Sequence, residues 1–464
     1  MSAWKACDLR GHYPDEINED LLGSVAAHIV DLLPPSPRVL MAGDFRESTP
    51  SLKRRIGAEL AAAGAHVMDA GQIPTPIAYY GHNYFGTDAV LIVTASHNPC
   101  TDNGLKLMID TVPPSEEQLS ALRTAIGRPR TYRPGGELET VDLTKRYLTW
   151  ITERWHRLRS LTKPQVVLDA GGGAWSELAP CVFNSLNFDI KKLFCELDGR
   201  FKSRKPDCAR PENLAVLCDS VRNSEANLGI AWDGDGDRVA FVDESGTVVL
   251  PDQISIILSR FMLRNRFRDK VVYDVKLSSR LPEAVHAAGG LALLERSGHA
   301  FLKKRMIEEH CVLGCEASGH YFYRELRGGD DGLFTALLMT EAIATEGGLK
   351  SLVEQLPPIY ATPDLRVPVN LVSYPVAESR FKSQFLHAQQ VRVDGCRFDL
   401  AEGSVLVRRS VTEPVITVRI EGIDRPALDH LIAECQKAIP EIAGSLKAVA
   451  EFKQESFNAG SLEK

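Results

Sequence analysis

The sequence predicts an α/β protein of four domains, the last of which is a smaller α+β domain. A length of 464 residues corresponds to about three or four domains. Short apolar runs that end in Gly, Asp or Ser alternate with longer segments of helical spacing over most of the chain, which is typical of buried parallel strands joined by helices. After residue 364 alternating segments such as VLVRRSVTEPVITVRIEG precede a helical stretch, which indicates the α+β domain.

The expected strands follow one another along the chain. The first pair is RVLMAGD with the helical segment SLKRRIGAELAAAG, and further strands are HVMDAG, AVLIV, QVVLDAGGG, LGIAW and KVVYDV. Polar or Pro/Gly-rich segments between them give the expected domain limits, which are 1–150, 151–252, 253–362 and 363–464. In such sheets ligands bind outside the carboxyl ends of the strands, and the unusual residues of this sequence cluster at those ends.

The composition excludes several classes of protein. A net charge of −7, from 54 basic and 61 acidic residues, argues against a general nucleic-acid surface. The longest apolar runs are far shorter than the ~20 residues of a membrane span, and the first residues contain no apolar signal core. The ten cysteines are scattered without a C-x2-C pair, so we expect buried free thiols in a reducing compartment. We therefore expect a cytoplasmic protein without nucleic-acid or membrane partners.

The most specific motif is WDGDGDR, residues 232–238, in which three aspartates alternate with glycines. Three carboxylates this close repel one another, so a hard divalent cation is expected between Asp233, Asp235 and Asp237. A calcium EF-hand is the alternative, because Glu244 stands at loop position 12 counted from Asp233. However, position 6, which must be glycine, is Arg238, and both flanks indicate strands rather than helices. The pattern favours Mg²⁺ beside a phosphate, while a solvated acidic turn stays open.

A serine follows the apolar run AVLIV in the segment TASHNP. Asn98-Pro99 keeps the backbone out of a helix and stiffens the turn. Ser96 lacks the G-x-S-x-G surroundings of a hydrolase nucleophile. His97 and Lys106 supply potential positive charge, and a serine that accepts a phosphoryl group needs such groups together with a cation. An ordinary turn serine is the alternative interpretation.

Two further segments suit a phosphosugar. GCEASGHYF carries Glu316 and Ser318, which would point the same way on an extended chain and could bind sugar hydroxyls. RRSVTEP places arginines and hydroxyls in one loop, which suits a phosphate. The alternatives are an ordinary polar loop and a solvated basic edge. There is no P-loop and no G-x-G-x-x-G segment, which argues against a kinase or a dehydrogenase.

Taken together, these motifs resemble those of the α-D-phosphohexomutases, most closely the phosphomannomutase/phosphoglucomutase branch. From Lys5 to about Gly422 the chain carries in order KACDLRG, GDFRES, DAGQIPTP, TASHNP, NGLK, DGDGDR, RSGHAFLKKRM, GCEASGHYF and RRSVTEP. The resemblance implies three related α/β domains and a C-terminal domain around a central cleft. It also implies reversible movement of phosphate between O1 and O6 of a hexose, with one Mg²⁺ per chain and a hexose 1,6-bisphosphate as intermediate and activator.

The resemblance also assigns roles to individual residues. Ser96 would be the phosphorylated serine, and the metal ligands would be Ser96, Asp233, Asp235 and Asp237. Proton transfer and charge stabilisation would fall to Arg10, His97, Lys106, Arg238 and His320. Glu316 and Ser318 would hold sugar hydroxyls, and the non-reacting phosphate would be bound by Arg408, Ser410 and Thr412. Arg296, which stands where relatives carry lysine, is assigned to substrate binding.

Some positions depart from the family pattern, and they bear on substrate choice. Cys7 replaces the usual tyrosine, Val411 an asparagine or glycine, and Gly172 an asparagine. Phosphoglucosamine mutase, a sugar 1,6-bisphosphate synthase and a non-catalytic phosphosugar-binding regulator are the alternative functions. We expect a monomer or a homodimer whose partner is a small phosphosugar.

Overall fold

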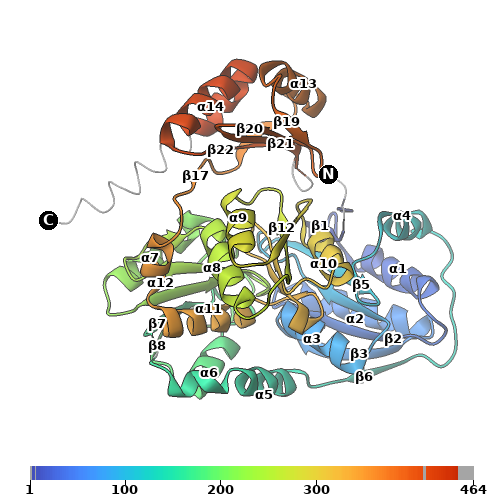
Figure 1. Ribbon diagram of the computed structural model, residues 1–464. Coiled ribbons are helices and arrows are strands. Elements are labelled where there is room, and N and C mark those ends of the chain that lie inside the picture. Colours follow the sequence, from blue (N-terminus) through green and yellow to red (C-terminus); the bar gives the residue numbers. More distant parts are fainter. Residues whose placement is uncertain (1–2, 6, 163, 411–413, 448–464) are drawn as a thin grey trace. The chain divides into compact units, whose positions relative to one another are not determined.

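The expected strands form four sheets in the part of the chain that the structure describes. The structure is a computed structural model (Figure 1), and it describes residues 3–5, 7–162, 164–410 and 414–447. The chain divides into two compact units. The first contains residues 1–273, 284–293 and 298–356, and the second contains residues 274–283, 294–297 and 357–464.

The first sheet has the order β1-β5-β4-β2-β3-β6. Its strands are β1 Leu9–His12, β2 Arg38–Gly43, β3 His66–Gln72, β4 Ala89–Val93, β5 Asp102–Ile109 and β6 Glu137–Thr140. Strands β4, β2, β3 and β6 run parallel, whereas β5 turns back antiparallel to β4. The helices of this region are α1 Glu19–Ile29, α2 Thr49–Ala62, α3 Thr75–Phe85, α4 Glu116–Ala125 and α5 Thr144–Arg154, with the 3₁₀ turns η1 Val30–Leu32 and η2 His156–Ser160.

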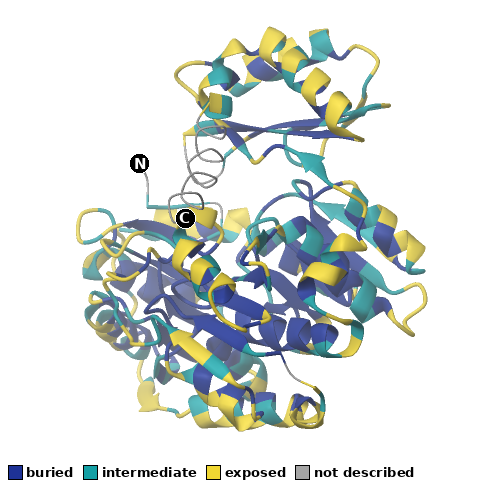
Figure 2. Cartoon of the chain, turned by 90° about the vertical axis from the view of Figure 1, so that its left-hand side faces the viewer, coloured by how far each residue is buried: buried dark blue, intermediate teal, exposed yellow. Residues whose placement is uncertain are grey.

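The central strands of this sheet are buried on both faces, which explains their continuous apolar runs. All five residues of β4 are buried, and Figure 2 shows that the interior strands of the chain are mostly buried, in dark blue. Side chains alternate between the faces of a strand. On one face, Val39 and Met41 of β2 join Leu52 and Ile56 of α2 in one apolar core. Helix α3 also contacts β2 and β4.

The second and third sheets are built on the same plan. The second has the order β11-β10-β9-β7-β8, with β7 Val166–Asp169, β8 Ile190–Leu193, β9 Leu228–Trp232, β10 Val239–Asp243 and β11 Val248–Val249. The third has the order β13-β12-β14-β15-β16, with β12 Lys270–Asp274, β13 Leu291–Glu295, β14 Leu313–Cys315, β15 Tyr321–Tyr323 and β16 Gly329–Asp330. Their helices are α6 Leu178–Ser185, η3 Pro211–Leu214, α7 Ala215–Arg222, α8 Pro251–Leu263, α9 Arg280–Ala287, α10 His299–Glu308, η4 Arg324–Leu326, α11 Gly332–Glu346 and α12 Leu349–Glu354.

One strand order recurs in these three sheets, as β5-β4-β2-β3, β10-β9-β7-β8 and β15-β14-β12-β13. Counted along the chain within each group of four, the third strand (β4, β9 or β14) runs parallel to the first (β2, β7 or β12). The fourth strand (β5, β10 or β15) turns back antiparallel to the third. The expectation of three related α/β domains is confirmed. The turn between the third and fourth strands holds TASHNP in the first sheet, DGDGDR in the second and EASGH in the third. The three most unusual motifs therefore occupy equivalent places.

The fourth sheet lies in the second unit and is antiparallel throughout its described pairs. Its order is β17-β22-β21-β20-β19, and β18 also pairs with β22. The strands are β17 Tyr360–Ala361, β18 Leu365–Pro368, β19 Gln389–Val391, β20 Cys396–Leu400, β21 Gly403–Arg409 and β22 Val415–Gly422. The helices are α13 Tyr374–Gln384, α14 Arg425–Ala438 and η5 Pro440–Ile442. The smaller α+β domain is thus confirmed.

Two expectations on composition have different outcomes. No helix in the described ranges is long and apolar enough to cross a membrane. All ten cysteines are free thiols, but only five of them are buried, and Cys100 and Cys181 are exposed. The prediction that the thiols are buried is therefore wrong for half of them.

His82 on α3 makes the stability of the fold depend on pH. Its Nδ1 lies 2.7 Å from Thr87 Oγ1, its Nε2 contacts the Asp110 carbonyl oxygen, and burial lowers its pKa to about 4. The unfolded chain, with a histidine pKa of about 6.5, binds more protons between these values. The contribution of His82 to stability is therefore complete above pH 6.5 and is lost as the pH falls towards 4.

We expect the stability difference between wild type and His82→Gln to shrink by about 2 kcal/mol from pH 7 to pH 5. Thermal unfolding at both pH values measures this difference. The exposed His156 gives the matched control, since His156→Gln replaces a side chain at the surface and should leave the stability unchanged. An equal pH dependence in wild type and His82→Gln would contradict the prediction.

Candidate active site

The three equivalent turns of the α/β sheets meet inside the first unit. The first and second turns are joined by Ser96 Oγ, which donates to Asp233 Oδ2 at 2.9 Å. The second and third are joined by a β-bridge between Arg238 and His320. Equivalent topology therefore brings together three motifs that are far apart in the sequence.

Ser96 is held in an unusual backbone conformation in the turn between β4 and β5. Its φ is +52°, in the left-handed region that a residue with a side chain adopts at a cost. The side chain is fully buried, the main-chain N–H donates to Thr94 Oγ1 at 2.8 Å, and Oγ lies 3.3 Å from His97 Nδ1. The serine is therefore fixed with its hydroxyl directed at the aspartate turn, as a reacting group requires.

Arg46 is the residue that fixes this turn, and the sequence analysis assigned it no role. Its guanidinium is fully buried and donates to four main-chain carbonyl oxygens between residues 96 and 102. These belong to Ser96 (2.7 Å), Asn98 (2.7 Å), Pro99 (2.5 Å) and Asp102 (3.0 Å). Its Nε donates to Asp44 Oδ2 at 3.0 Å. One planar cation thus satisfies the carbonyls of a loop without regular structure. The sequence feature that could have indicated this role is the arginine in GDFRES, which follows directly after a buried strand.

The three aspartates form one buried cluster. Ligand oxygens of Asp233, Asp235 and Asp237 lie within 4.8 Å of one another, and all three side chains are buried. Lys106 Nζ donates to Asp235 Oδ2 at 2.7 Å and also contacts Asp237 Oδ2. Thr75 Oγ1 donates to Asp235 Oδ2 at 2.7 Å. Neither Thr75 nor this Lys106 pairing could be read from the sequence, because residues more than a hundred positions apart meet here.

The pKa values show that this cluster is short of positive charge. Burial raises the pKa of Asp233 well above its ordinary value, and the charges of Asp237 and Asp235 raise it further. For Asp235 and Asp237 burial acts in the same direction, but Lys106 and other donors outweigh it, so their pKa values are lowered. The pKa of Lys106 is raised well above its ordinary value, because these carboxylates outweigh the effect of burial. Lys106 and its neighbouring donors therefore favour the ionised form of two of the three carboxyls.

The residues fit a divalent cation. Asp235 Oδ1 and Asp237 Oδ1 are buried and accept no hydrogen bond in the described part of the chain, and such orphaned oxygens are costly unless a ligand binds them. An oxygen-only set favours a hard divalent cation, Mg²⁺ or Ca²⁺. The flanking segments are strands β9 and β10, so the EF-hand alternative is excluded.

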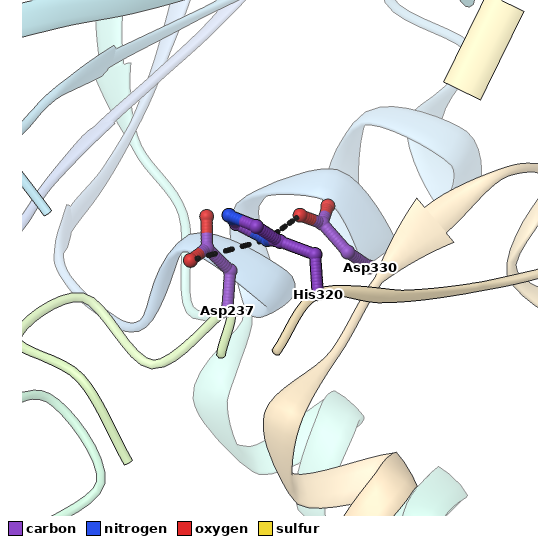
Figure 3. Close-up of side chains that lie close together, drawn as sticks. All are labelled: Asp237, His320 and Asp330. Atoms are coloured by element: carbon purple, nitrogen blue, oxygen red, sulfur yellow. Dashed lines mark hydrogen bonds and ion pairs between the residues drawn. The ribbon is translucent and has the colours of Figure 1, made fainter. Parts of the chain in front are cut away.

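His320 stands beside this cluster at the end of the third turn (Figure 3). Its Nδ1 lies 2.7 Å from Asp330 Oδ2 and 3.6 Å from Asp237 Oδ1. Burial lowers the pKa of His320, but the carboxylates of Asp237 and Asp330 outweigh it, so the pKa is raised. Arg238 Nε donates to His320 Nε2 at 2.8 Å, which requires a lone pair there. The Arg238 contact thus favours a neutral ring with its proton on Nδ1, towards Asp330, although the two carboxylates raise the pKa.

Arg10 and His97 differ in the charge they can supply. Arg10 is almost fully buried, donates to Asp8 Oδ2 at 2.8 Å, and keeps its charge. Burial lowers the pKa of His97 well below its ordinary value, and the charges of Arg238 and Arg10 lower it further. Positive charge was expected at His97, but these surroundings favour the neutral ring.

Glu316 and Ser318 lie in the third turn, but not on extended chain. The Gly319 N–H donates to the Glu316 carbonyl oxygen at 3.0 Å, and Gly319 has a φ of +91°, which closes a tight turn. The prediction that Glu316 and Ser318 lie on extended chain is therefore wrong. The cause is the glycine after Ser318, which allows the left-handed conformation.

The remaining predicted residues lie in the second unit. Arg408 at the end of β21 is buried, and its Nε donates to Asp394 Oδ2 at 2.7 Å. Ser410 N–H donates to the Val415 carbonyl oxygen at 2.9 Å. Arg296 precedes Ser297 at the end of β13, whereas Thr412 and Val411 lie outside the described residues.

Two residues of RSGHAFLKKRM also lie near the cluster, and the sequence analysis assigned neither a role. The His299 ring centre is 6.0 Å from that of His320, and burial, aided by the charge of Lys106, lowers the pKa of His299 to about 4. Lys303 Nζ lies 3.8 Å from the centre of the Tyr79 ring, and burial lowers its pKa to about 8. The signal was their helical spacing of four, which places both on one face of α10.

Comparison with known proteins agrees with this geometry. Four models of the phosphoglucomutase/phosphomannomutase family match the chain: α/β/α domain I at residues 2–133, domain II at 145–246, domain III at 250–360 and the C-terminal domain at 371–438. The site geometry and the four matches define a phosphohexomutase-type protein. The chain belongs to the phosphoglucomutase/phosphomannomutase family. The exact domain limits given above stay predictions.

Individual relatives extend over almost the whole chain. A phosphomannomutase/phosphoglucomutase of Pseudomonas syringae pv. tomato is 32% identical over 449 residues, covering 95% of this chain and 96% of the relative. A phosphoglucomutase of Neisseria gonorrhoeae is 30% identical over 459 residues, covering 97% and 96%. The crystal structure of a family member from Burkholderia thailandensis superposes with a TM-score of 0.85 at 30% identity, covering 95% of this chain and 97% of that one.

We expect Arg46→Met to destabilise the protein by about 3–5 kcal/mol, because Asp44 loses its cation inside the core. Limited proteolysis should also cut residues 94–101 faster. The control is Arg200→Met, since the Arg200 side chain is 54% exposed and its acidic partners are 3.4 and 3.5 Å away. Thermal unfolding and the proteolysis rate measure both variants. Equal effects of the two substitutions would contradict the role given to Arg46.

Proposed function

We propose that this family member interconverts hexose 1-phosphate and hexose 6-phosphate, with mannose and/or glucose as the sugar. The proposed route runs through phosphorylated Ser96 and a hexose 1,6-bisphosphate. The observation that carries the proposal is the 2.9 Å contact between Ser96 Oγ and Asp233 Oδ2, which sets a buried, conformationally fixed hydroxyl against an acidic cluster. A turn serine without chemistry has no need of such surroundings.

Charge neutralisation is the main requirement of this chemistry, because phosphoryl transfer depends on positioning and electrostatic stabilisation. Bound to Ser96, Asp233, Asp235 and Asp237, Mg²⁺ would neutralise negative charge on the transferring group. Lys106 stays protonated between two carboxylates and can donate to a phosphoryl oxygen. Arg10 and Arg238 add permanent charge beside the turn. Closely packed cations of this kind suit an anionic group that is transferred rather than merely bound.

The proton of the attacking sugar hydroxyl needs an acceptor, and His320 is the best placed. Asp330 holds its Nδ1 at 2.7 Å, which orients Nε2 as the basic atom. Once Arg238 moves towards the phosphoryl oxygens, Nε2 can accept the hydroxyl proton and return it to the leaving oxygen in the reverse transfer. His97, held neutral by its surroundings, can donate or accept a hydrogen bond at Ser96.

Recognition of the substrate is assigned to separate residues. Glu316 and Ser318 would bind sugar hydroxyls. In the second unit Arg296, Arg408, Ser410 and Thr412 would bind the phosphate that does not react. A hexose 1,6-bisphosphate would activate the enzyme by phosphorylating Ser96. A cytoplasmic location, a monomer or homodimer, and a phosphosugar as sole partner belong to the same proposal.

We expect the wild-type protein to gain one phosphoryl group when incubated with glucose 1,6-bisphosphate and Mg²⁺, because Ser96 accepts it. Intact mass spectrometry measures the gain. Ser96→Ala should gain none. Ser176→Ala is the matched control, because Ser176 is equally buried but donates only to the Gly173 carbonyl oxygen, at 2.7 Å. If wild type gains no phosphoryl group, a phosphosugar-binding regulator becomes the better interpretation.

We expect mannose 1-phosphate or glucose 1-phosphate to give a kcat/KM at least about tenfold above that of glucosamine 1-phosphate, a difference of about 1.4 kcal/mol in transition-state binding. Coupled assays with bisphosphate activator measure the three rates. Turnover of glucosamine 1-phosphate alone would make phosphoglucosamine mutase the function. Net accumulation of free bisphosphate would indicate a sugar 1,6-bisphosphate synthase.

A further inference from the structure

Asp394 lies in the turn between β19 and β20, and its carboxylate contacts an arginine assigned to phosphate binding. Arg408 Nε donates to Asp394 Oδ2 at 2.7 Å, and the two side chains are only 7% and 15% exposed. We infer that Asp394 is a positioning residue that sets the guanidinium of Arg408 for the non-reacting phosphate. This inference rests on the proposed function.

The carboxylate of Asp394 contacts Arg408 at one side of the guanidinium. Asp394 binds Arg408 at Nε, and in the described part of the chain neither Nη1 nor Nη2 of Arg408 makes a hydrogen bond or ion pair with another residue. The end of a guanidinium offers two parallel N–H groups, which match two oxygens of a phosphate. A carboxylate at Nε therefore orients the two Nη groups of the guanidinium without binding them.

The same carboxylate oxygen makes a second contact with the segment that carries Arg296. The Ser297 main-chain N–H donates to Asp394 Oδ2 at 3.2 Å, and Ser297 Oγ donates to Asp274 Oδ2 at 3.2 Å. Within the second unit, Asp394 thus ties the end of β21 to the end of β13. Both segments carry residues assigned to the substrate, so one side chain fixes the distance between them.

The backbone around Asp394 restricts where its carboxylate can lie. Gly395 has a φ of +72°, and a Cβ atom there would lie 2.2 Å from the Val407 carbonyl oxygen. The turn is therefore pressed against β21 immediately before Arg408, and only glycine fits. A short carboxylate on a closely packed turn holds its partner more firmly than one on a flexible stem. An arginine side chain loses much rotational freedom when it is fixed, and fixing it before binding favours affinity.

The test compares Asp394→Asn with Asp399→Asn. Asp399 is the matched control, because it also accepts from an arginine Nε, that of Arg397 at 2.8 Å, on the same sheet. We expect Asp394→Asn to raise the KM for hexose 1-phosphate about tenfold, as expected for weakening one charge-assisted hydrogen bond, while kcat changes less than about twofold. Asp399→Asn should leave both unchanged. A merely structural role would lower thermal stability without this separation of KM from kcat.

A double-mutant cycle with Arg408→Ala separates the possible failures. If Asp394 acts through Arg408, Asp394→Asn will add little to the higher KM of Arg408→Ala. If Arg408→Ala leaves KM unchanged, the phosphate-binding role in the proposed function fails. If Arg408→Ala raises KM but Asp394→Asn does not, the inference alone is overturned. A lower KM for Asp394→Asn would also overturn it, since the carboxylate would then compete with phosphate.

Discussion

The site depends on one electrostatic constraint, which is the burial of three carboxylates within a single turn. Asp233, Asp235 and Asp237 are at most 1% exposed, so their mutual repulsion is screened weakly by water. Lys106 reaches two of them, and Ser96 donates a hydrogen bond to the third. Both Lys106 and Ser96 stabilise this negative charge, one with a positive charge and one with a hydrogen bond. The same charge creates a place that a divalent cation would stabilise.

The fold meets this constraint by repeating one topology three times. In each α/β sheet the turn between the third and fourth strands carries candidate site residues, with Ser96 in the first, the aspartates in the second and His320 in the third. A turn at the carboxyl end of a buried strand is held by the sheet beneath it, so its side chains are fixed without a large loop. Arg46 supplies the additional fixation in the turn that has no regular structure of its own.

Much of this could be predicted, because its signals are local. The strands follow from short apolar runs, and the aspartate cluster follows from three carboxylates in five residues. The partners of the cluster could not be predicted, because packing alone joins Thr75 to Asp235. For the same reason the contact of Asp330 with His320 could not be predicted, since no local pattern links the two residues. The extended chain expected at Glu316 failed because one glycine, Gly319, closes the turn.

The division of the chain into two units separates two tasks. The first unit contains Ser96, the carboxylates and the cations, to which the proposed function assigns the transferred phosphoryl group. The second contains Arg296 and Arg408, which are assigned to the end of the substrate that does not react. Of the described departures from the family pattern, Cys7 and Gly172 lie in the first unit and Arg296 in the second, while the serine, the aspartates and Lys106 keep the pattern. Divergence from relatives should therefore act on how the substrate is held, because a change among the buried charges would cost far more than a change in a binding loop.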